Sequence, residues 1–488
     1  MKTLTALLLG AILLGMASPV VGAEESTPPE PATGPLPHIP ELPVFPNPRY
    51  DVQRLSLSQV LIKALGQSPS IVISRKEVSV RYAQRLTAIE TFFPSIFVGG
   101  STTTYSGEIQ STSGQFENVT KQDSFLSHGL LLSVNPASSA FQTLIATTNL
   151  DRAQSFLSET ENQKMAQAAS LYFQTLGAYS KIAVLGEAIK ISKLILDEER
   201  RLVALGGASV VGILRAGHEV ARNTRLLVAE ENNAYRLSFR LGQIMGEDPP
   251  VLPVPRESFL VPRLYLDDHE NLRHLLALSD KKRPLLAASR KSVLAKQQAF
   301  QDVLFGPAFP TLSVGIINGS LGPDFNTLAG MNQAVTMAFW NIGPGGLLDP
   351  GALYLARKHV RLENAVLSRE QFSVHREVSD GFESFRKTRE EASVALEDVR
   401  LANLTFNATQ VRVRLGLYHA LELIISLRDL IHAQIRYVEI VTEFETAQFQ
   451  LMAAIGVRPD LVGLGAPAHI SGLPGPISPK SAKKKEKK

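Results

Sequence analysis

The longest hydrophobic pattern in the sequence is a helical one over about residues 137–205. This segment contains no proline, and alanine, leucine, glutamine, glutamate and lysine, which favour helices, dominate it. A helix of this length reaches roughly 100 Å, because each residue adds about 1.5 Å. Apolar and small residues recur at alternating spacings of three and four, which is typical of a coiled-coil seam. These residues are Met165, Ala169, Tyr172, Leu176, Tyr179, Ala183 and Gly186.

A second segment of the same kind runs from about Gly351 to Leu415, and the two segments keep a fixed distance in the sequence. Gly206 and Gly416, which end the two helical patterns, are 210 residues apart. The same interval separates Tyr172 from Phe382 and Gly246 from Gly456. We therefore predict an internal duplication, with repeats over residues 55–246 and 269–456 and a linker over residues 247–268.

The helices that precede the long segments end at prolines. We predict one helix from Leu57 to Phe93, with a corner at Ser68–Pro69, and another from Glu270 to Phe305. Pro94 and Pro310 mark the change from helix to strand, and Phe-Pro-Ser-Ile at 93–96 recurs as Phe-Pro-Thr-Leu at 309–312. Two further helices are predicted after the long ones, at Ala208–Met245 and Leu417–Ile455.

After each proline the hydrophobic period falls from about 3.6 to 2, which indicates strands. Strands are predicted at Ile96–Tyr105 and Ser124–Val134, with residues 106–123 as a polar loop. In the second repeat they are predicted near residues 311–316 and at Gln333–Trp340. Each strand has about ten residues, the length that a tilted strand needs to cross a bilayer.

Alternation of apolar with small polar residues is typical of the wall of a membrane β-barrel. An alternative is a water-soluble hairpin packed on helices. Four strands cannot close a barrel, and an open edge in lipid would leave backbone groups unpaired. The chain must then assemble, and three copies would supply twelve strands.

Composition adds a processing signal and excludes several kinds of site. Residues 1–23 have the apolar core and small-residue end of a secretory signal peptide, and residues 24–54 form a proline-rich leader. Residues 457–488 are rich in glycine and proline and then in lysine, and we expect them to be disordered. The formal charge is +4, but residues 480–488 alone contribute +5, so the basic balance belongs to a tail and does not indicate nucleic-acid binding.

We find no catalytic, cofactor or metal motif, and the ten histidines lack metal-ligand spacing. Cysteine is absent, which excludes disulfides and thiolate metal sites. The protein is therefore not expected to be an enzyme.

In the order and phase of its elements the chain resembles the TolC-type outer membrane efflux family. The resemblance covers about residues 55–456. It rests on the Leu-Ser-Gln-Val-Leu opening at 57–61, on the repeated helix-stopping prolines and on the glycine turns Leu205–Ser209 and Leu415–Tyr418. It implies a homotrimer in the cell outer membrane, with a twelve-stranded β-barrel continued by a helical coiled-coil barrel in the periplasm. A periplasmic adaptor and an inner membrane pump would be the partners.

The resemblance also implies a closed periplasmic tip just after the glycine turns Gly206, Gly207 and Gly416. Acidic residues often point inward there, and the pattern of glycine, five residues and acid selects Glu422. Three copies of Glu422 would form a cation-attracting constriction. The alternative is a glutamate that only stabilises the start of a helix. The first repeat has Gly212 at the equivalent position.

Three functions are consistent with these patterns. The first is an exit duct for the efflux of small molecules or ions. The second is an exit duct for type I protein secretion, which the sequence does not separate from the first because the pump selects the cargo. The third is a periplasmic coiled-coil scaffold without a pore.

Overall fold

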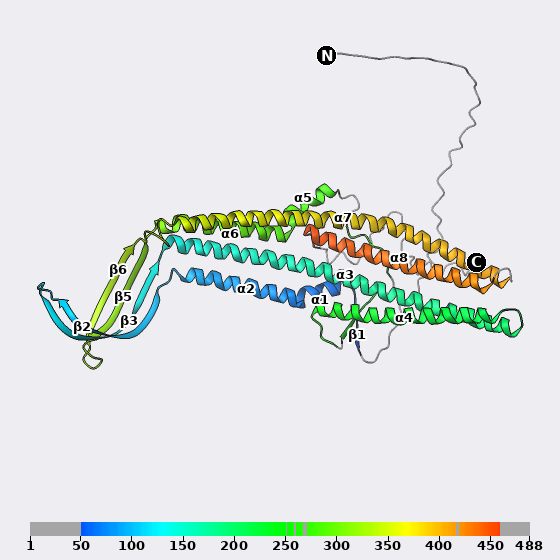
Figure 1. Cartoon of the computed structure of the whole chain (residues 1–488), viewed down its shortest axis with the longest axis horizontal. Coiled ribbons are helices and arrows are strands. Elements are labelled where there is room, and N and C mark those ends of the chain that lie inside the picture. The colour runs from blue at the N-terminus through cyan, green and yellow to red at the C-terminus, as the bar shows by residue number, and fades with distance from the viewer. Residues whose placement is uncertain (1–49, 250, 258–259, 267–270, 416–418, 459–488) are drawn as a thin grey trace, which may run out of the picture. The chain divides into compact units, whose positions relative to one another are not determined.

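The computed structural model describes residues 50–249, 251–257, 260–266, 271–415 and 419–458. The predicted signal peptide, most of the leader, Gly416 and the tail from residue 459 lie outside the described residues. Within the described part the chain forms eight α-helices (Figure 1). They are α1 (Leu57–Gln67), α2 (Pro69–Glu90), α3 (Pro136–Ala204), α4 (Val210–Met245), α5 (Leu272–Lys282), α6 (Pro284–Phe305), α7 (Pro350–Arg414) and α8 (Ala420–Ile455).

The two long helices confirm the prediction from the hydrophobic pattern. Helix α3 has 69 residues and α7 has 65. Each begins with a proline in its first turn and an oxygen-bearing cap, the arrangement that satisfies the free N–H groups of a helix start. Asn135 Oδ1 accepts a hydrogen bond from Ser138 N at 3.0 Å, and Asp349 Oδ1 accepts one from Ala352 N at 2.8 Å.

The predicted corner at Ser68–Pro69 is confirmed, since α1 ends at Gln67 and α2 begins at Pro69. The single helix predicted from Glu270 to Phe305 is wrong. It is two helices, α5 and α6, with Arg283 between them in an extended conformation. Pro284 forces this break, because a proline ring excludes the helical conformation at the residue before it.

The helices pack side by side in one row. Near the strands the order is α2, α3, α6, α7, and near the turns that end the long helices the order is α4, α3, α8, α7. Hydrogen bonds mark the change along α3, which reaches α6 through Thr148 and Gln298 and later reaches α4 through Ser192 and Asn223. Both long helices therefore run the whole length of the row, while their neighbours change midway (Figure 1).

The strands β2 (Ser95–Gln110), β3 (Phe116–Val134), β5 (Thr311–Gly322) and β6 (Ala329–Phe339) form an antiparallel sheet in the order β2–β3–β5–β6. This order repeats that of the helices from which the strands continue. The predicted loop over residues 106–123 is mostly wrong, since β2 and β3 pair as far as Gln110 and Phe116. Ile109, Phe116 and Val119 favour extended backbone there, although most of the residues around them are polar.

A small second sheet corrects the predicted leader and linker. Strand β1 (Asp51–Leu55) pairs in parallel with β4 (Val251–Pro255). The leader predicted over residues 24–54 therefore ends in a strand, and the linker over residues 247–268 contains one. Both strands lie against α3 or α4, and the Tyr172 hydroxyl donates to the Leu55 carbonyl at 3.3 Å. Together with α1 they cover one face of the helix row with a buried apolar core.

Two glycines hold the junctions where the shorter helices meet end to end. Gly246 ends α4 with φ of 73°, and a Cβ added there would lie 2.6 Å from the Gln67 carbonyl oxygen at the end of α1. Gly456 ends α8 with φ of 84°, and a Cβ there would lie 2.7 Å from the Lys282 carbonyl oxygen. Both positions need glycine for its positive φ and for its lack of a side chain.

The second junction also contains a buried ion pair. Arg283 is 4% exposed, and its Nη2 lies 2.8 Å from Glu159 on α3 and 3.1 Å from Glu377 on α7. Its Nη1 donates to the Ala453 carbonyl near the end of α8. Burial raises the pKa of the Glu159 carboxyl, and the Arg283 charge opposes this shift. One guanidinium thus connects four segments at this junction.

Two buried side chains of α8 hold the segment that follows β4. Arg263 N donates to Glu445 at 2.5 Å, and Tyr265 N donates to Gln448 Oε1 at 2.8 Å. Gln448 Nε2 returns a hydrogen bond to the Arg263 carbonyl at 2.8 Å. Both side chains are fully buried. Burial raises the pKa of the Glu445 carboxyl well above its usual value, although the hydrogen bond from Arg263 N lowers it.

We predict that the junction glycines are sensitive and a glycine within α4 is not. Gly246→Ala and Gly456→Ala should each destabilise the fold by about 1–2 kcal/mol from the left-handed backbone alone, and contact with the facing carbonyl adds to this. Gly217→Ala is the matched control, because no atom lies within 4 Å of its added Cβ and alanine favours a helix interior by up to about 1 kcal/mol. Urea unfolding followed by circular dichroism checks all three.

A second prediction concerns Glu445 and pH. Because its pKa is raised in the folded state, folded protein binds a proton that unfolded protein has released, so stability falls as pH rises above the unfolded pKa near 4.3. Glu445→Gln keeps the oxygen that accepts from Arg263 N and removes the titration. The variant should therefore lose less stability than the wild type between pH 5 and pH 8 in urea unfolding. Parallel pH profiles for the two proteins would contradict this.

Candidate functional site: a channel wall

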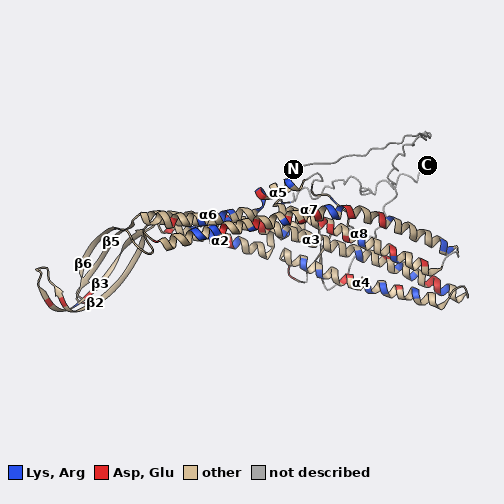
Figure 2. Ribbon diagram, turned by 45° about the horizontal axis from the view of Figure 1, so that its top comes forward, with Lys and Arg blue, Asp and Glu red and all other residues tan. Residues whose placement is uncertain are grey.

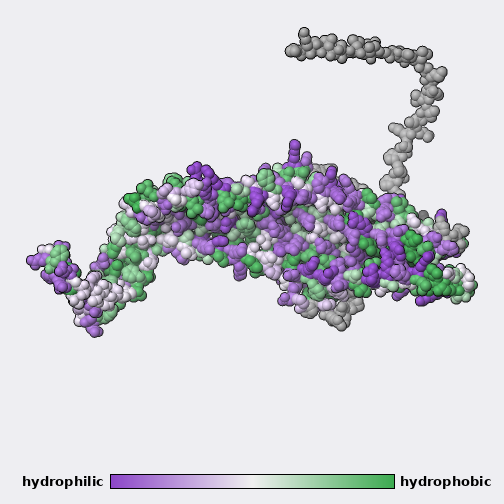
Figure 3. Space-filling view, viewed as in Figure 1, coloured by the Kyte–Doolittle hydropathy of each residue, from purple (hydrophilic) through white to green (hydrophobic). Residues whose placement is uncertain are grey.

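One face of the four-stranded sheet is apolar and exposed. The pairings Ile96–Leu130, Leu130–Ile316 and Leu132–Val314 place these side chains on the same face. Ile96 and Val98 are each 81% exposed and Ile316 is 60% exposed. No charged residue occurs in β5, in β6 or in the paired part of β3 from Ser124 to Val134, and Figure 2 shows these strands almost without charge. In Figure 3 hydrophobic residues cover the strands next to the helices.

On β3 and β5 the opposite face of the sheet carries small residues and is less exposed than the apolar face. Ser127, Ser313 and Gly315 are buried there. Added Cβ atoms at Gly129 and Gly315 would lie 2.3 Å and 2.9 Å from carbonyl oxygens of the neighbouring strand. The small residues therefore lie on the inside of a curved sheet, and its apolar face is the convex one. An apolar convex face suits lipid, because none of the described residues covers it.

The helix row has one covered face and one polar face. On α3, Met165, Tyr172 and Leu176 lie in the core that α1 covers. Residues two positions earlier point to the opposite side, because two residues advance a helix by about 200°. Those residues are polar: Gln163, Ser170 and Gln174.

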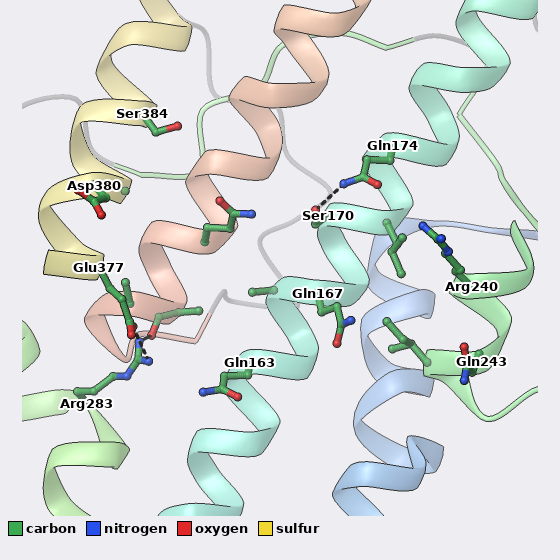
Figure 4. A pocket seen from close by; sticks show the side chains of 17 residues that line it. Gln163, Gln167, Ser170, Gln174, Arg240, Gln243, Arg283, Glu377, Asp380 and Ser384 are labelled. Carbon is green, nitrogen blue, oxygen red and sulfur yellow. Dashed lines mark hydrogen bonds and ion pairs between the residues drawn. The ribbon is translucent and has the colours of Figure 1, made fainter. Parts of the chain in front are cut away.

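The polar face contains a cavity of about 980 Å³. Helices α3, α4, α7 and α8 all contribute to its lining, and amide side chains dominate the part from α3 (Figure 4). Gln174 donates to Ser170 at 3.1 Å, while Arg283 and Glu377 are paired at its edge. Arg240 and Asp380, one of each sign, also line it. An exposed hollow of amides and balanced charges holds water well and has no preference for one sign of charge.

At the end of the helix row away from the sheet, α3 and α7 end and α4 and α8 begin, and we call this end the turn end. Gly206 has φ of 74°, and Gly207 N donates to the Leu202 carbonyl at 2.9 Å, so these two residues end α3. Gly416 lies outside the described residues. Pro94 lies between α2 and β2, and Pro310 lies directly before β5.

Glu422 lies in the first turn of α8, and its side chain is half-buried. Its N–H donates to the His419 carbonyl at 3.2 Å, and its Oε2 atom is buried with no hydrogen-bond donor among the described residues. A buried carboxylate oxygen without a donor in the described part of the chain suits a contact with another subunit or a place in a passage.

Sequence reasoning missed a second acid at the turn end. Glu199 of α3 is 7% exposed. A Cβ added at Gly212 of α4 would lie 1.9 Å from Glu199 Oε2, so the carboxylate occupies the space that a side chain at 212 would fill. Burial, and then the neighbouring Glu198, raise the pKa of the Glu199 carboxyl, while His419 lowers it.

The described residues contain no group of three or more histidine, cysteine or acidic side chains placed to bind a metal. No described helix is both long and apolar enough to cross a bilayer.

No protein-family model matches the sequence, and no curated protein does either. The structure is similar to solved outer membrane proteins. The CmeC outer membrane channel of Campylobacter jejuni is 12% identical, with a TM-score of 0.68 over 82% of this chain and 85% of that one. VceC of Vibrio cholerae is 14% identical, with a TM-score of 0.66 over 83% and 97%. The open MtrE channel of Neisseria gonorrhoeae is 13% identical, with a TM-score of 0.67 over 86% and 98%.

The three channels share the fold of this chain over 82% to 86% of its length. The resemblance to TolC-type outer membrane channels that the motifs predict is confirmed at the level of the fold.

Proposed function

We propose that the protein is the outer membrane exit duct of a tripartite efflux system. The observation that carries the proposal is the four-stranded sheet, whose convex face is apolar and uncovered, joined to a helix row with one polar face. A soluble scaffold has no use for such a sheet. The channels that share the fold support the same reading.

Closure requires more than one chain. The outer edges of β2 and β6 have no partner strand among the described residues, and such edges are unfavourable in lipid. Three copies would pair these edges into twelve strands, and the helix rows would close into a tube below them. The polar face with the amide-lined cavity would line the passage, since the other face carries α1 and the β1–β4 pair.

The proposed orientation places the barrel in the outer membrane and the helices in the periplasm, where the turn end would meet a periplasmic adaptor and an inner membrane pump. We also propose two structural repeats, at 55–246 and 269–456. Their junction glycines, Gly246 and Gly456, make equivalent contacts with the corners at Ser68 and Arg283. A duct for type I protein secretion would use the same geometry.

The gate prediction concerns Glu422. In the proposed trimer three copies would surround the axis at the turn end and attract cations. Glu422→Gln keeps the shape and removes the charge, so the cation preference should fall in single-channel recordings from planar bilayers. Glu443→Gln, an exposed glutamate further along α8, is the control. A preference unchanged by Glu422→Gln would exclude Glu422 from the gate, and absence of any conductance from the wild type would contradict the duct.

A separate prediction concerns insertion of the four-stranded sheet into the membrane. Ile316→Lys places a charge on the convex face, which costs about 2–4 kcal/mol near the centre of a bilayer. The amount of protein recovered in the outer membrane fraction should fall markedly. Ser101→Lys is the control on the opposite face of β2 and should insert normally. Equal recovery of both variants would show that the convex face does not contact lipid.

A further inference from the structure

A second cavity, of about 340 Å³, lies between the first turns of α4 and α8 at the turn end. Its walls are mostly apolar. It is lined by Val211, Leu214, Arg215, His218, Leu421, Ile424 and Arg428. The three polar side chains in this set are all basic, and no acidic side chain lines the cavity.

The basic groups at this cavity are not fully paired. Arg215 and His218 are exposed and have no ion pair among the described residues. The Arg428 Nε atom is buried and has no hydrogen-bond acceptor in the described part of the chain. A buried guanidinium N–H without an acceptor is costly, and an anion in the cavity would supply the missing acceptor.

One buried carboxylate, that of Glu219, pairs with Arg428 of the cavity lining and also with Arg222. Glu219 is 1% exposed and accepts from Arg222 at 2.8 Å and from Arg428 at 2.5 Å. Arg222 Nη2 also lies 3.0 Å from His432 Nε2. Glu219 therefore balances one of two arginines, Arg215 adds a further positive charge, and the His218 ring offers an N–H donor.

The helix starts strengthen this charge. Both α4 and α8 begin at the cavity, and the exposed N–H groups of a helix start carry partial positive charge. Ser209 caps α4 through Val211 N, while no side chain caps α8. Glu422 lies in the first turn of α8 but is not part of the lining.

We propose that this cavity binds amphipathic organic anions, with the apolar body against Leu214, Leu421 and Ile424 and the anionic head on Arg215, His218 and Arg428 Nε. One consequence, that anionic amphiphiles belong to the cargo, rests on the proposed duct function. Binding itself follows from the cavity. The cation-attracting ring proposed at Glu422 would then be followed by a site of the opposite preference.

The test uses the purified full-length protein in amphipol and isothermal titration with naphthalene-1-sulfonate. The matched probe is naphthalen-1-ylmethylammonium, which has a similar apolar body and a positive head. The wild type should bind the sulfonate and not the ammonium. The double variant Arg215→Gln, His218→Gln should weaken sulfonate binding by about tenfold or more, since it removes the guanidinium charge of Arg215 and the ring N–H of His218 from the anionic head.

Arg225→Gln is the control variant, because Arg225 is exposed on α4 outside the lining. It removes one positive charge and should leave affinity within about twofold of the wild type. Leu214→Ser tests the apolar wall and should weaken binding of the sulfonate. The proposal fails if the wild type binds both probes equally or neither, or if the double variant binds as the wild type does.

An alternative is that the basic residues of the cavity hold subunits together. The oligomeric state of the double variant, measured by native mass spectrometry, tests this alternative. Loss of the assembly would assign the cavity to a contact between subunits and overturn the proposal. Conductance in planar bilayers tests the duct function independently of ligand binding. A protein that conducts but binds no sulfonate keeps the duct and loses the site, and one that binds without conducting keeps the site and loses the duct.

Discussion

The structure depends on two uninterrupted helices that hold two interrupted ones in line. At one junction α4 ends against the corner between α1 and α2, and at the other α8 ends against the corner between α5 and α6. Neither junction is continuous, so the row is held straight only because α3 and α7 cross both levels without a break. The order of the strands then follows from the order of the helices. The curved four-stranded sheet is therefore a product of how the row is built.

Buried polar groups, rather than apolar contacts alone, fix how far each helix is shifted along its neighbours at the junctions. Apolar side chains along a coiled coil recur every three to four residues, so the helices could slide by one turn with little loss of contact. Arg283 meets Glu159, Glu377 and the end of α8 at a single position, and Glu445 with Gln448 holds the backbone near residue 264 at another. A slip of one turn would leave these buried groups unpaired, which costs far more than the apolar contact regained.

Local signals in the sequence were sufficient for the main elements and insufficient for the contacts between them. Proline positions and the hydrophobic period predict α3, α7 and the strands, because each signal acts within a few residues. The break at Pro284 was missed although Pro69 occupies the same place in the other half, since the flanking residues keep a helical pattern. Strands β1 and β4 were missed because five-residue strands that pair 200 residues apart leave no local trace. The burial of Glu199 could not be predicted because it depends on the space that Gly212 leaves on the adjacent helix.

The same limit explains why the lining of the two hollows could not be derived from the sequence. An exposed glutamine such as Gln167 and an exposed arginine such as Arg215 look alike as surface residues, and only the packing of the row places both on walls of hollows. The two hollows differ in the charge of their linings. The amide-lined hollow carries balanced charge midway along the helices, whereas the described lining of the hollow at the turn end has basic groups and no acidic one. The two hollows therefore offer a solute different surroundings, basic and apolar at the turn end and polar with balanced charge midway along the helices.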